Sequence, residues 1–413
     1  MSSIFQDSPE YVRRTKTPFK PPQVTLAEVR AAVPKHLFQK STFRGLLFVF
    51  RDIVLVLVLY ELAHRIGPFI KAYRQISLLV PFLLRPLLWC AYWLFQSLTF
   101  AGCWCLAHEA GHGTLVSISW LNHVIGFTFH TALLVPYYAW RSTHQAHHKA
   151  TGSLERDENY LPKTRSDYGL PAERITHLAD YHEIFEETPV YTFLRMFAMQ
   201  MIGWQWYLAT NIQGNPAYPS GTNHFKPSSA LFKPHERMKI VASNVGLAIV
   251  ILLLSIWTRH VGFSNFFCFY FVPYLLTNHW IVMLTFLHHS DPTLPHYRGK
   301  AWSFVRGAVA TVDRPLLGWM GRFFLHNVSH DHVAHHLFSN VPFYNQPYVT
   351  EAIKAVLKDD YNYDSTNSFR ALYRSFSQCC FIEDDGDIVF YKNKDGRPLR
   401  VLECDAVKRP SVD

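Results

Sequence analysis

The stretch Arg141-Ser-Thr-His-Gln-Ala-His-His-Lys149 places three histidines within five positions of the chain. On a helix of about 3.6 residues per turn, His144, His147 and His148 stand at i, i+3 and i+4, so their imidazoles leave the same face. Such a face can bind a metal ion, although a surface helix with three histidines is more often simply solvated. This stretch alone therefore leaves both interpretations open.

Two further histidine clusters repeat this spacing. His332, His335 and His336 again stand at i, i+3 and i+4, and His108 and His112 stand one helical turn apart. Three clusters with chelating spacing favour metal binding over a solvated surface. They supply eight imidazoles, whereas a zinc site takes four ligands, or three and a water, so they predict two metal ions. Imidazole ligands are compatible with iron, copper, nickel or zinc.

The composition of the chain is typical of a membrane protein. Hydrophobic residues make up 49% of the 413 residues, charged residues 17% and aromatic residues 15%. The formal net charge of +9 is compatible with binding to nucleic acid, anionic lipid or an acidic protein. No nucleic-acid-binding motif accompanies that charge, which favours lipid and a protein partner. The 7 cysteines form no CxxC pair, and we expect them to be reduced.

Apolar segments predict membrane-spanning helices at about residues 46–64, 80–106, 241–257 and 265–287. Residues 1–42 are basic and carry no apolar run, so we expect them in the cytosol and expect the first span to direct the chain to the membrane. Two crossings then return the first histidine cluster to the cytosolic face. The second pair of spans forms a hairpin that brings the third cluster to the same face.

The segments between and beside these spans have their own patterns. The apolar stretch from Leu121 to Tyr138 is expected to be interfacial or re-entrant, because one crossing would separate the first two clusters. Residues 193–208 predict another interfacial helix. Thr25-Leu-Ala-Glu28 has the form of a capping box that opens a helix to about Ala32. A further helix is expected at about Thr350 to Leu357.

The sequence therefore predicts an all-α integral membrane protein with about four transmembrane helices in two hairpins and a cytosolic helical cap that carries the metal site. We divide it into a cytosolic N-terminal segment (1–42), a membrane domain (43–345) and a cytosolic C-terminal segment (346–413). The histidine boxes at 108–112, 144–148 and 332–336 all belong to the membrane domain. The role of the C-terminal segment stays open.

The three clusters resemble the histidine boxes of membrane fatty acid desaturases. They read His108-Glu-Ala-Gly-His112, His144-Gln-Ala-His-His148 and His332-Val-Ala-His-His336. Val135-Pro-Tyr-Tyr-Ala-Trp-Arg141 and Arg306-Gly-Ala-Val-Ala-Thr-Val-Asp-Arg314 are similar to segments of the acyl-lipid Δ12 (oleate) desaturases, most closely the fungal ones. The resemblance covers roughly residues 20–360.

The resemblance implies a non-haem di-iron centre that uses O2 to remove two hydrogens from adjacent methylenes of an acyl chain. It implies Δ12 desaturation of phospholipid-bound oleoyl chains to linoleoyl chains, with electrons from cytochrome b5 and its NADH-dependent reductase. It also implies a multi-pass protein of the endoplasmic reticulum membrane whose active site faces the cytosol. The catalytic, iron-binding histidines that it implies are His108, His112, His144, His147, His148, His332, His335 and His336, with His289 as a further iron ligand.

The resemblance indicates the class of the reaction more clearly than it indicates the product. Ala110 stands where many members of the family carry cysteine, and Gly113 stands where many carry histidine. Residues around this box influence the product, so an ω3 desaturase, an acetylenase, a conjugase and a hydroxylase stay open. The exact acyl carrier, the regiospecificity, the oligomeric state and the role of His288 stay open as well.

Several other polar residues need an assignment. Asp157, Asp313 and Asp331 are candidates for holding ligand N–H groups in place, with surface ion pairs as an equal alternative. Glu109 lies on a different helical face from His108 and His112 and is not counted as a ligand. The residues that lack chelating spacing and are expected to be structural are Asn122, His123, His130, His279 and His326.

A histidine-rich metal transporter is the rival interpretation from another class. Transport sites usually lie near the membrane midplane, whereas these clusters lie at the ends of the predicted helices, which favours the enzyme. Carbons 12 and 13 of a lipid acyl chain lie deep in the bilayer, so we expect a bent apolar tunnel lined by the second and fourth spanning helices. The chain has no His-Pro-Gly-Gly haem-binding signature, so cytochrome b5 is expected to be a separate partner.

Overall fold

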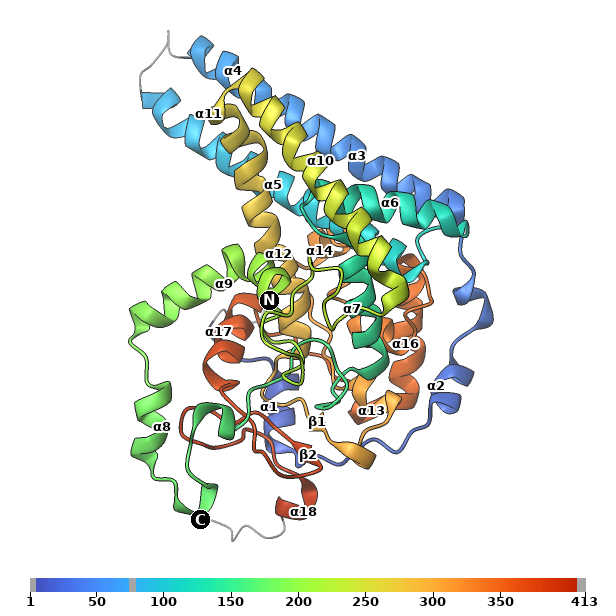
Figure 1. Cartoon of the computed structure of the whole chain (residues 1–413), viewed down its shortest axis with the longest axis vertical. Helices are drawn as coiled ribbons and strands as arrows, with labels where there is room; N and C mark the ends of the chain where they lie inside the picture. The colour runs from blue at the N-terminus through green and yellow to red at the C-terminus, as the bar shows by residue number, and fades with distance from the viewer. Residues whose placement is uncertain (1–4, 74–78, 407–413) are drawn as a thin grey trace.

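The computed structural model describes residues 5–73 and 79–406, and the chain is mostly helical (Figure 1). The single short sheet pairs β1 (His296–Tyr297) antiparallel with β2 (Ile388–Val389) among the described residues. The helices are α1 (Pro9–Lys16), α2 (Leu26–Ala32), α3 (Thr42–His64), α4 (Ile66–Tyr73), α5 (Leu79–His112), α6 (Ser119–Ala132), α7 (Tyr137–Ala150), α8 (Leu178–Phe185), α9 (Pro189–Thr210), α10 (Arg237–Val261), α11 (Phe263–Phe266), α12 (Val272–His289), α13 (Phe304–Val309), α14 (Trp319–Phe324), α15 (His332–Leu337), α16 (Gln346–Leu357), α17 (Ser368–Gln378) and α18 (Glu403–Ala406). The predicted α-helical class is confirmed.

Long helices extend from one end of a rounded body (Figure 1). The four expected spans fall within α3, α5, α10 and the continuous run of α11, the π-helical turn Phe267–Phe271 and α12. The segments Pro234–Val261 and Phe263–His289 are long and apolar enough to cross a membrane by length and composition.

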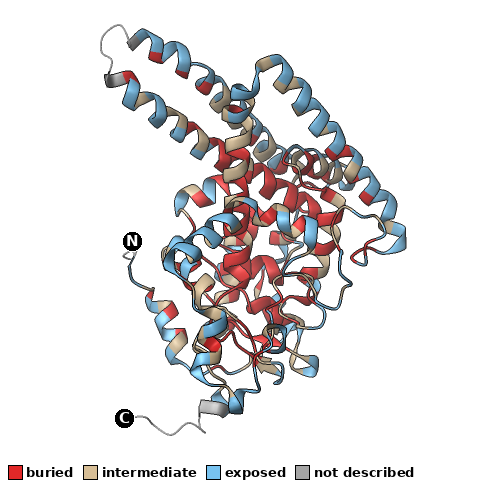
Figure 2. Ribbon diagram, turned by 60° about the vertical axis from the view of Figure 1, so that its left-hand side comes forward, coloured by how far each residue is buried: buried red, intermediate tan, exposed pale blue. Residues whose placement is uncertain are grey.

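The extended helices expose their apolar side chains. Figure 2 shows buried residues gathered in the body, while the extended end is largely exposed. On α10, Ile249, Leu252 and Leu253 are each more than half exposed. A continuous exposed apolar face of this kind indicates contact with lipid.

The charged pair Arg51-Asp52 interrupts the apolar sequence of α3 but faces the protein. The Asp52 carboxylate is 1% exposed and lies 2.7 Å from Nε2 of His326, and Arg51 lies beside both residues. An ionisable group at membrane depth is stabilised by such a partner within the protein. The opposite side of α3 therefore stays apolar in spite of the pair.

The predicted interfacial segments are also helical. α6 has 14 residues, which corresponds to about 21 Å, so it is shorter than the roughly 30 Å hydrocarbon core of a bilayer. α9 begins four residues before the expected helix and exposes Phe193, Leu194 and Phe197. Both features fit helices that lie along a membrane surface.

The two helices predicted in the flanking segments are confirmed. The Thr25 hydroxyl accepts a hydrogen bond from the backbone N–H of Glu28, and the Glu28 carboxylate accepts one from the backbone N–H of Thr25. The other helix, α16, ends at Leu357 as expected but begins at Gln346, because Pro347 fits the first turn of a helix without losing a hydrogen bond.

The expected N-terminal and C-terminal segments pack against each other and against the body. The Ser8 hydroxyl donates a 2.8 Å hydrogen bond to Asp364, and the Ser8 amide donates one of 2.9 Å to Thr366. Further along, the Phe19 amide donates a 2.8 Å hydrogen bond to the Val401 carbonyl. Segments nearly 400 residues apart in sequence therefore share one surface.

A buried ion cluster fastens these segments to the end of α12. Arg314 lies 2.6 Å from Asp291 and also pairs with Asp364, while Arg374 lies 2.5 Å from Asp364. Burial alone would raise the pKa of Asp364, but the two arginines lower it below its ordinary value, so the carboxylate stays ionised. Arg314 also donates a 2.9 Å hydrogen bond to the Leu287 carbonyl and so fixes the last turn of α12.

Candidate metal centre

The first two histidine boxes lie on neighbouring helices. His108 and His112 occupy the last two turns of α5, and the second box lies on α7. Arg141 and Gln145 of α7 donate hydrogen bonds of 2.8 Å and 3.1 Å to the Gly111 carbonyl of α5. These bonds hold the two box-bearing helices side by side.

The third box lies on the short helix α15, which faces the end of α12. The Asp313 carboxylate accepts a 2.7 Å hydrogen bond from the backbone N–H of Val333 and so fixes the first turn of α15. Nε2 of His332 lies 3.0 Å from Nε2 of His289, the last residue of α12. The residues after the fourth expected span therefore join the third box, as the sequence predicts.

The ring nitrogens of these residues converge in two groups. Within each group, the candidate ligand atoms all lie within 4.8 Å of one another. In the first group, Nε2 of His144 lies 3.0 Å from Nε2 of His112 and 3.1 Å from Nε2 of His148. The members of the first group are His108, His112, His144, His148 and His335, and those of the second are His147, His289 and His336.

Burial keeps these imidazoles neutral. It lowers the pKa of His108 to about 3 and the pKa of His112 to about 3, and it holds that of His144 well below its ordinary value. A neutral imidazole keeps the lone pair that a metal ion requires. Nε2 of His147, His335 and His336 is buried without a hydrogen-bond partner.

Convergent, unpartnered nitrogens are what a metal site requires. Buried polar atoms normally have a hydrogen-bond partner, and ring nitrogens 3 Å apart repel unless a proton or a cation lies between them. Two metal ions, one in each group, would satisfy both sets. The imidazole-only ligands fit iron, as well as copper and zinc.

Three polar side chains lie beside rings of the candidate ligands. Nδ1 of His147 donates a 2.6 Å hydrogen bond to the Asp157 carboxylate, which leaves Nε2 facing the second group. Nδ1 of His336 lies 3.1 Å from the Thr151 hydroxyl. Nδ1 of His108 lies 3.2 Å from the Glu109 carboxylate.

Of the three aspartates that are candidates for holding ligand N–H groups, one contacts the ring of a candidate ligand. Asp157 holds a ligand N–H, whereas Asp313 holds the backbone of α15 and Asp331 pairs with Arg322 at 3.0 Å. The sequence predicts that Glu109 lies on a different helical face from His108, yet its carboxylate lies 3.2 Å from Nδ1 of His108 without a hydrogen bond between them. A carboxylate directly beside a ligand histidine is the signal that could have identified it.

The remaining histidines lie outside the two groups. Nδ1 of His288 donates a 2.6 Å hydrogen bond to the Val312 carbonyl, and its ring lies 4.4 Å from that of His332. His279 contacts Gln200, and His326 contacts Asp52. The other residues predicted to be structural, Asn122, His123 and His130, lie on α6. His332, a predicted ligand, is also outside both groups, although its Nε2 lies 3.0 Å from that of His289.

An apolar cavity of about 500 Å³ is connected to the second histidine group through Tyr160, which lines the cavity and stacks on His289. Its lining includes Met199 and Trp204 of α9, Val282 and Phe286 of α12, and the loop residue Tyr160. Residues of α12 line this cavity, as expected for the predicted tunnel, whereas no residue of α5 does and the other wall comes from α9. Its size and lining are those of a small-molecule site.

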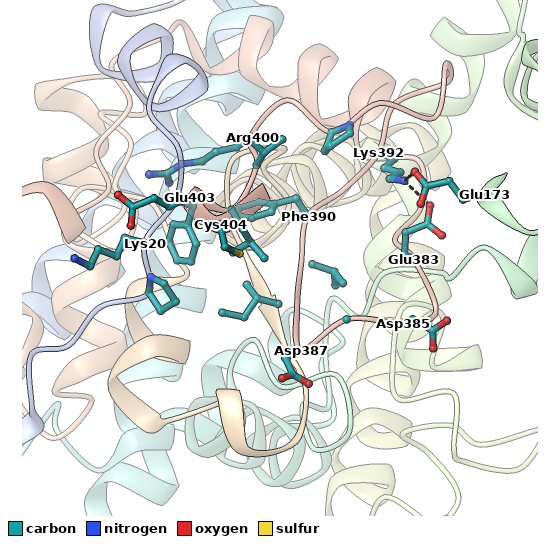
Figure 3. Close-up of a pocket in the computed structure, with 18 residues that line it drawn as sticks. Lys20, Glu173, Glu383, Asp385, Asp387, Phe390, Lys392, Arg400, Glu403 and Cys404 are labelled. Carbon is teal, nitrogen blue, oxygen red and sulfur yellow. Dashed lines mark hydrogen bonds and ion pairs between the residues drawn. The ribbon is translucent and has the colours of Figure 1, made fainter. Parts of the chain in front are cut away.

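A second cavity of about 690 Å³ lies far from the histidines, where the chain ends meet (Figure 3). Lys20 and Arg400 lie at one side of it, and at the other side Lys392 forms ion pairs of 2.6 Å with Glu173 and Glu383. No histidine lines this cavity. No histidine lines the apolar cavity either, but its lining includes Tyr160, whose ring contacts His289 and His147, so the chemistry of the protein is expected at that smaller cavity.

The fold and the site define a class of helical protein in which clustered imidazoles, compatible with metal binding, lie near an apolar cavity. A family model described as "Fatty acid desaturase" matches residues 86–367, and one described as "Domain of unknown function (DUF3474)" matches residues 9–61. The chain belongs to the fatty acid desaturase family, as its histidine boxes predict, and is therefore a membrane-bound oxidoreductase.

Relatives with several different product types match most of the chain. The Delta(12) fatty acid desaturase of Mortierella alpina is 39% identical over 376 residues, which cover 90% of this chain and 91% of that protein. The oleate hydroxylase of Claviceps purpurea is 36% identical over 402 residues, which cover 91% of this chain and 82% of that protein. The Delta(12) acyl-lipid conjugase of Impatiens balsamina is 34% identical over 370 residues, which cover 90% of each chain.

Proposed function

We propose that this protein introduces the 12,13 double bond into oleoyl chains of phospholipids and so produces linoleoyl chains. In this reaction two C–H bonds break, a C=C bond forms, and O2 with two electrons and two protons leaves as two waters. The relatives named Δ12 desaturases support this product. The observation that carries the proposal is the apolar cavity, which ends at Tyr160 against His289 of the second histidine group.

We assign the two histidine groups to two iron ions. Iron held there would supply the activation of O2 that is needed to break an unactivated C–H bond. The chain's own residues bind the ions with neutral rings, keep the ring of His147 in one tautomer through Asp157, and surround the site with buried side chains that exclude water. The proposed ligands are His108, His112, His144, His148 and His335 for one ion and His147, His289 and His336 for the other. We add His332 to the second set, because its Nε2 lies 3.0 Å from Nε2 of His289.

The proposed topology has four spans, formed by α3, α5, α10 and the run from α11 through α12. His112 ends α5 and His289 ends α12, which supports placing all the boxes at one membrane face. We propose that this face is cytosolic, that the membrane is the endoplasmic reticulum, and that cytochrome b5 and its NADH-dependent reductase deliver the electrons. In this proposal residues 1–42 and 346–413 flank a membrane domain at 43–345 and form part of its cytosolic surface.

Product analysis in a host that lacks linoleate tests the proposal. Wild-type protein should yield linoleate in the phospholipid fraction by gas chromatography with mass spectrometry, and purified protein should carry about two irons per chain. His335→Ala should accumulate to the same level and yield none. The matched control is His260→Ala, which replaces an exposed histidine and should leave the product unchanged. Zinc in place of iron, together with no unsaturated product, would contradict the proposal.

Hydroxylation of the same acyl chain is the second candidate function. The oleate hydroxylase of Claviceps purpurea supports it, while the departures at Ala110 in the first box and at Gly113 next to it leave the product open. The same assay separates the two functions, because a 12-hydroxy acid and a diene differ in mass and retention. A product that is mainly hydroxylated would replace desaturation as the principal activity.

A further inference from the structure

Tyr160 lies at the boundary between the apolar cavity and the second histidine group. Its ring lines the cavity and stacks on His289, with ring centroids 4.7 Å apart and planes 2° from parallel. The same ring meets His147 edge-on at 5.7 Å. One aromatic side chain therefore separates two candidate ligands from the space in which we place an acyl chain.

The backbone holds this side chain in place. Tyr160 has φ of +60°, a left-handed conformation that non-glycine residues adopt only when their surroundings enforce it. Just before it, the Asn159 amide donates to Asp157, and the Asn159 side chain accepts a 2.5 Å hydrogen bond from Tyr207 of α9. The short loop is thus anchored to His147 through Asp157 at one end and to α9 at the other.

Thr285 marks the same boundary on α12. Its side chain lines the cavity, and His289, one helical turn later, belongs to the second histidine group. Tyr160 lines the cavity together with Thr285, while its ring covers His289. The side chain of Tyr160 therefore extends from the cavity wall to the candidate metal ligand His289 along one face of α12.

We propose that Tyr160 is a specificity-determining residue whose ring sets which acyl carbon lies against the second metal ion and how closely it approaches. This inference rests on the proposed function. A chain that fills the cavity meets this ring before it can approach His289, so the ring limits both its depth and its lateral position. The identity of the product, which differs among the relatives, should then depend on this side chain.

Substitutions at this position test the proposal in the full-length protein. Tyr160→Phe keeps the ring and should preserve the ratio of product positions, and of diene to hydroxylated acid, to within about twofold. Tyr160→Ala and Tyr160→Leu should change one of those ratios by ~10-fold or more, the range expected for one altered contact in an apolar site. Tyr168→Ala is the matched control, because Tyr168 lines a neighbouring cavity but not the apolar one.

The outcomes separate a specificity role from a structural one. Unchanged ratios in the Ala and Leu variants overturn the proposal, even if the total product falls. If neither variant accumulates while Tyr160→Phe does, the ring is structural and the proposal is overturned as well.

A second measurement does not depend on turnover. A phospholipid whose acyl chain carries a diazirine at carbon 12 should label residue 160 of the wild-type protein on illumination. If the wild type makes no unsaturated product but is labelled there, the proposed function fails and the role of Tyr160 stands. Labelling elsewhere, with none at residue 160, overturns the role of Tyr160.

Discussion

Replacing Asp157 with asparagine should weaken metal binding at the second histidine group. One oxygen of the Asp157 carboxylate accepts hydrogen bonds from His147 at 2.6 Å and from the Asn159 amide at 3.1 Å, and the other accepts one from Gly152 at 2.8 Å. An asparagine amide offers one oxygen and one NH2 group. If the NH2 group replaces the oxygen that faces Gly152, one N–H donor faces another donor, and in the other orientation the N–H groups of both His147 and Asn159 do.

The magnitude follows from the lost charge. A hydrogen bond to an ionised group contributes ~1.5–3 kcal/mol, against ~0.5–1.5 kcal/mol for a neutral pair, so the bond to His147 weakens by ~1–2 kcal/mol. A change of ~1.4 kcal/mol is a tenfold change in affinity, which gives ~5–30-fold weaker binding. Removal of the group that accepts a hydrogen bond from a metal-bound histidine typically lowers metal affinity by ~10–100-fold. This effect overlaps the range above.

Competition with a chelator of known affinity measures the effect. Under anaerobic conditions, Asp157→Asn should lose about one of its two irons at a chelator concentration that leaves the wild type loaded, because the first group does not contact Asp157. Glu158→Gln is the matched control, since the Glu158 carboxylate accepts its 2.6 Å hydrogen bond from Tyr218 and not from a histidine. If Asp157→Asn retained iron as tightly as this control, the assigned role of Asp157 would be refuted.

Three further perturbations probe the scaffold of the site. Asp364→Asn leaves its two buried arginine partners undercompensated and should lower the free energy of unfolding by ~3–5 kcal/mol, measured by thermal unfolding in detergent. Asp359→Asn, whose side chain is 94% exposed, should change it by less than ~1 kcal/mol, and an equal effect of the two would contradict the reasoning. Against the effect of burial, the arginines hold the pKa of Asp364 below its ordinary value, so this stabilisation is complete above about pH 4 and is lost as the pH falls. Between about pH 5 and pH 3, the melting temperature of the wild type should therefore fall more than that of Asp364→Asn. Equal falls in the two melting temperatures would refute the link between the charge of Asp364 and stability. Gly307→Ala places a methyl group 2.0 Å from the Thr151 carbonyl and should destabilise the protein by ~1–3 kcal/mol and lower its iron content, whereas Gly67→Ala, with nothing within 4 Å, should be tolerated. Equal melting temperatures for these two glycine variants would contradict the close approach of α13 to the second box.

Local patterns predicted much of the site from the sequence alone. The spacing of His144, His147 and His148 depends only on helical geometry, which the sequence around them favours. The capping box of α2 is equally local, because all four of its atoms come from Thr25 and Glu28. The requirement that all boxes share one membrane face then brought His289 into the same region.

Contacts between distant segments could not be predicted in this way. The left-handed conformation of Tyr160 is enforced by Tyr207 and His289, which lie 47 and 129 positions further along the chain. The wall contributed by α9 depends on how that helix packs on α12, and periodicity carries no information on its partner. The inward face of the Arg51-Asp52 pair likewise depends on His326, far away in sequence.

The hydrogen bonds from Ser8 to Asp364 and Thr366 have a consequence for biosynthesis. A ribosome must translate more than 350 codons after Ser8 before its partner exists, and until then Arg314 has only Asp291 to neutralise it. The last turn of α12, which carries His289, is therefore fixed late. Nascent protein should take up its full complement of metal only after residue 364 has emerged, which couples maturation of the enzyme to the completion of translation.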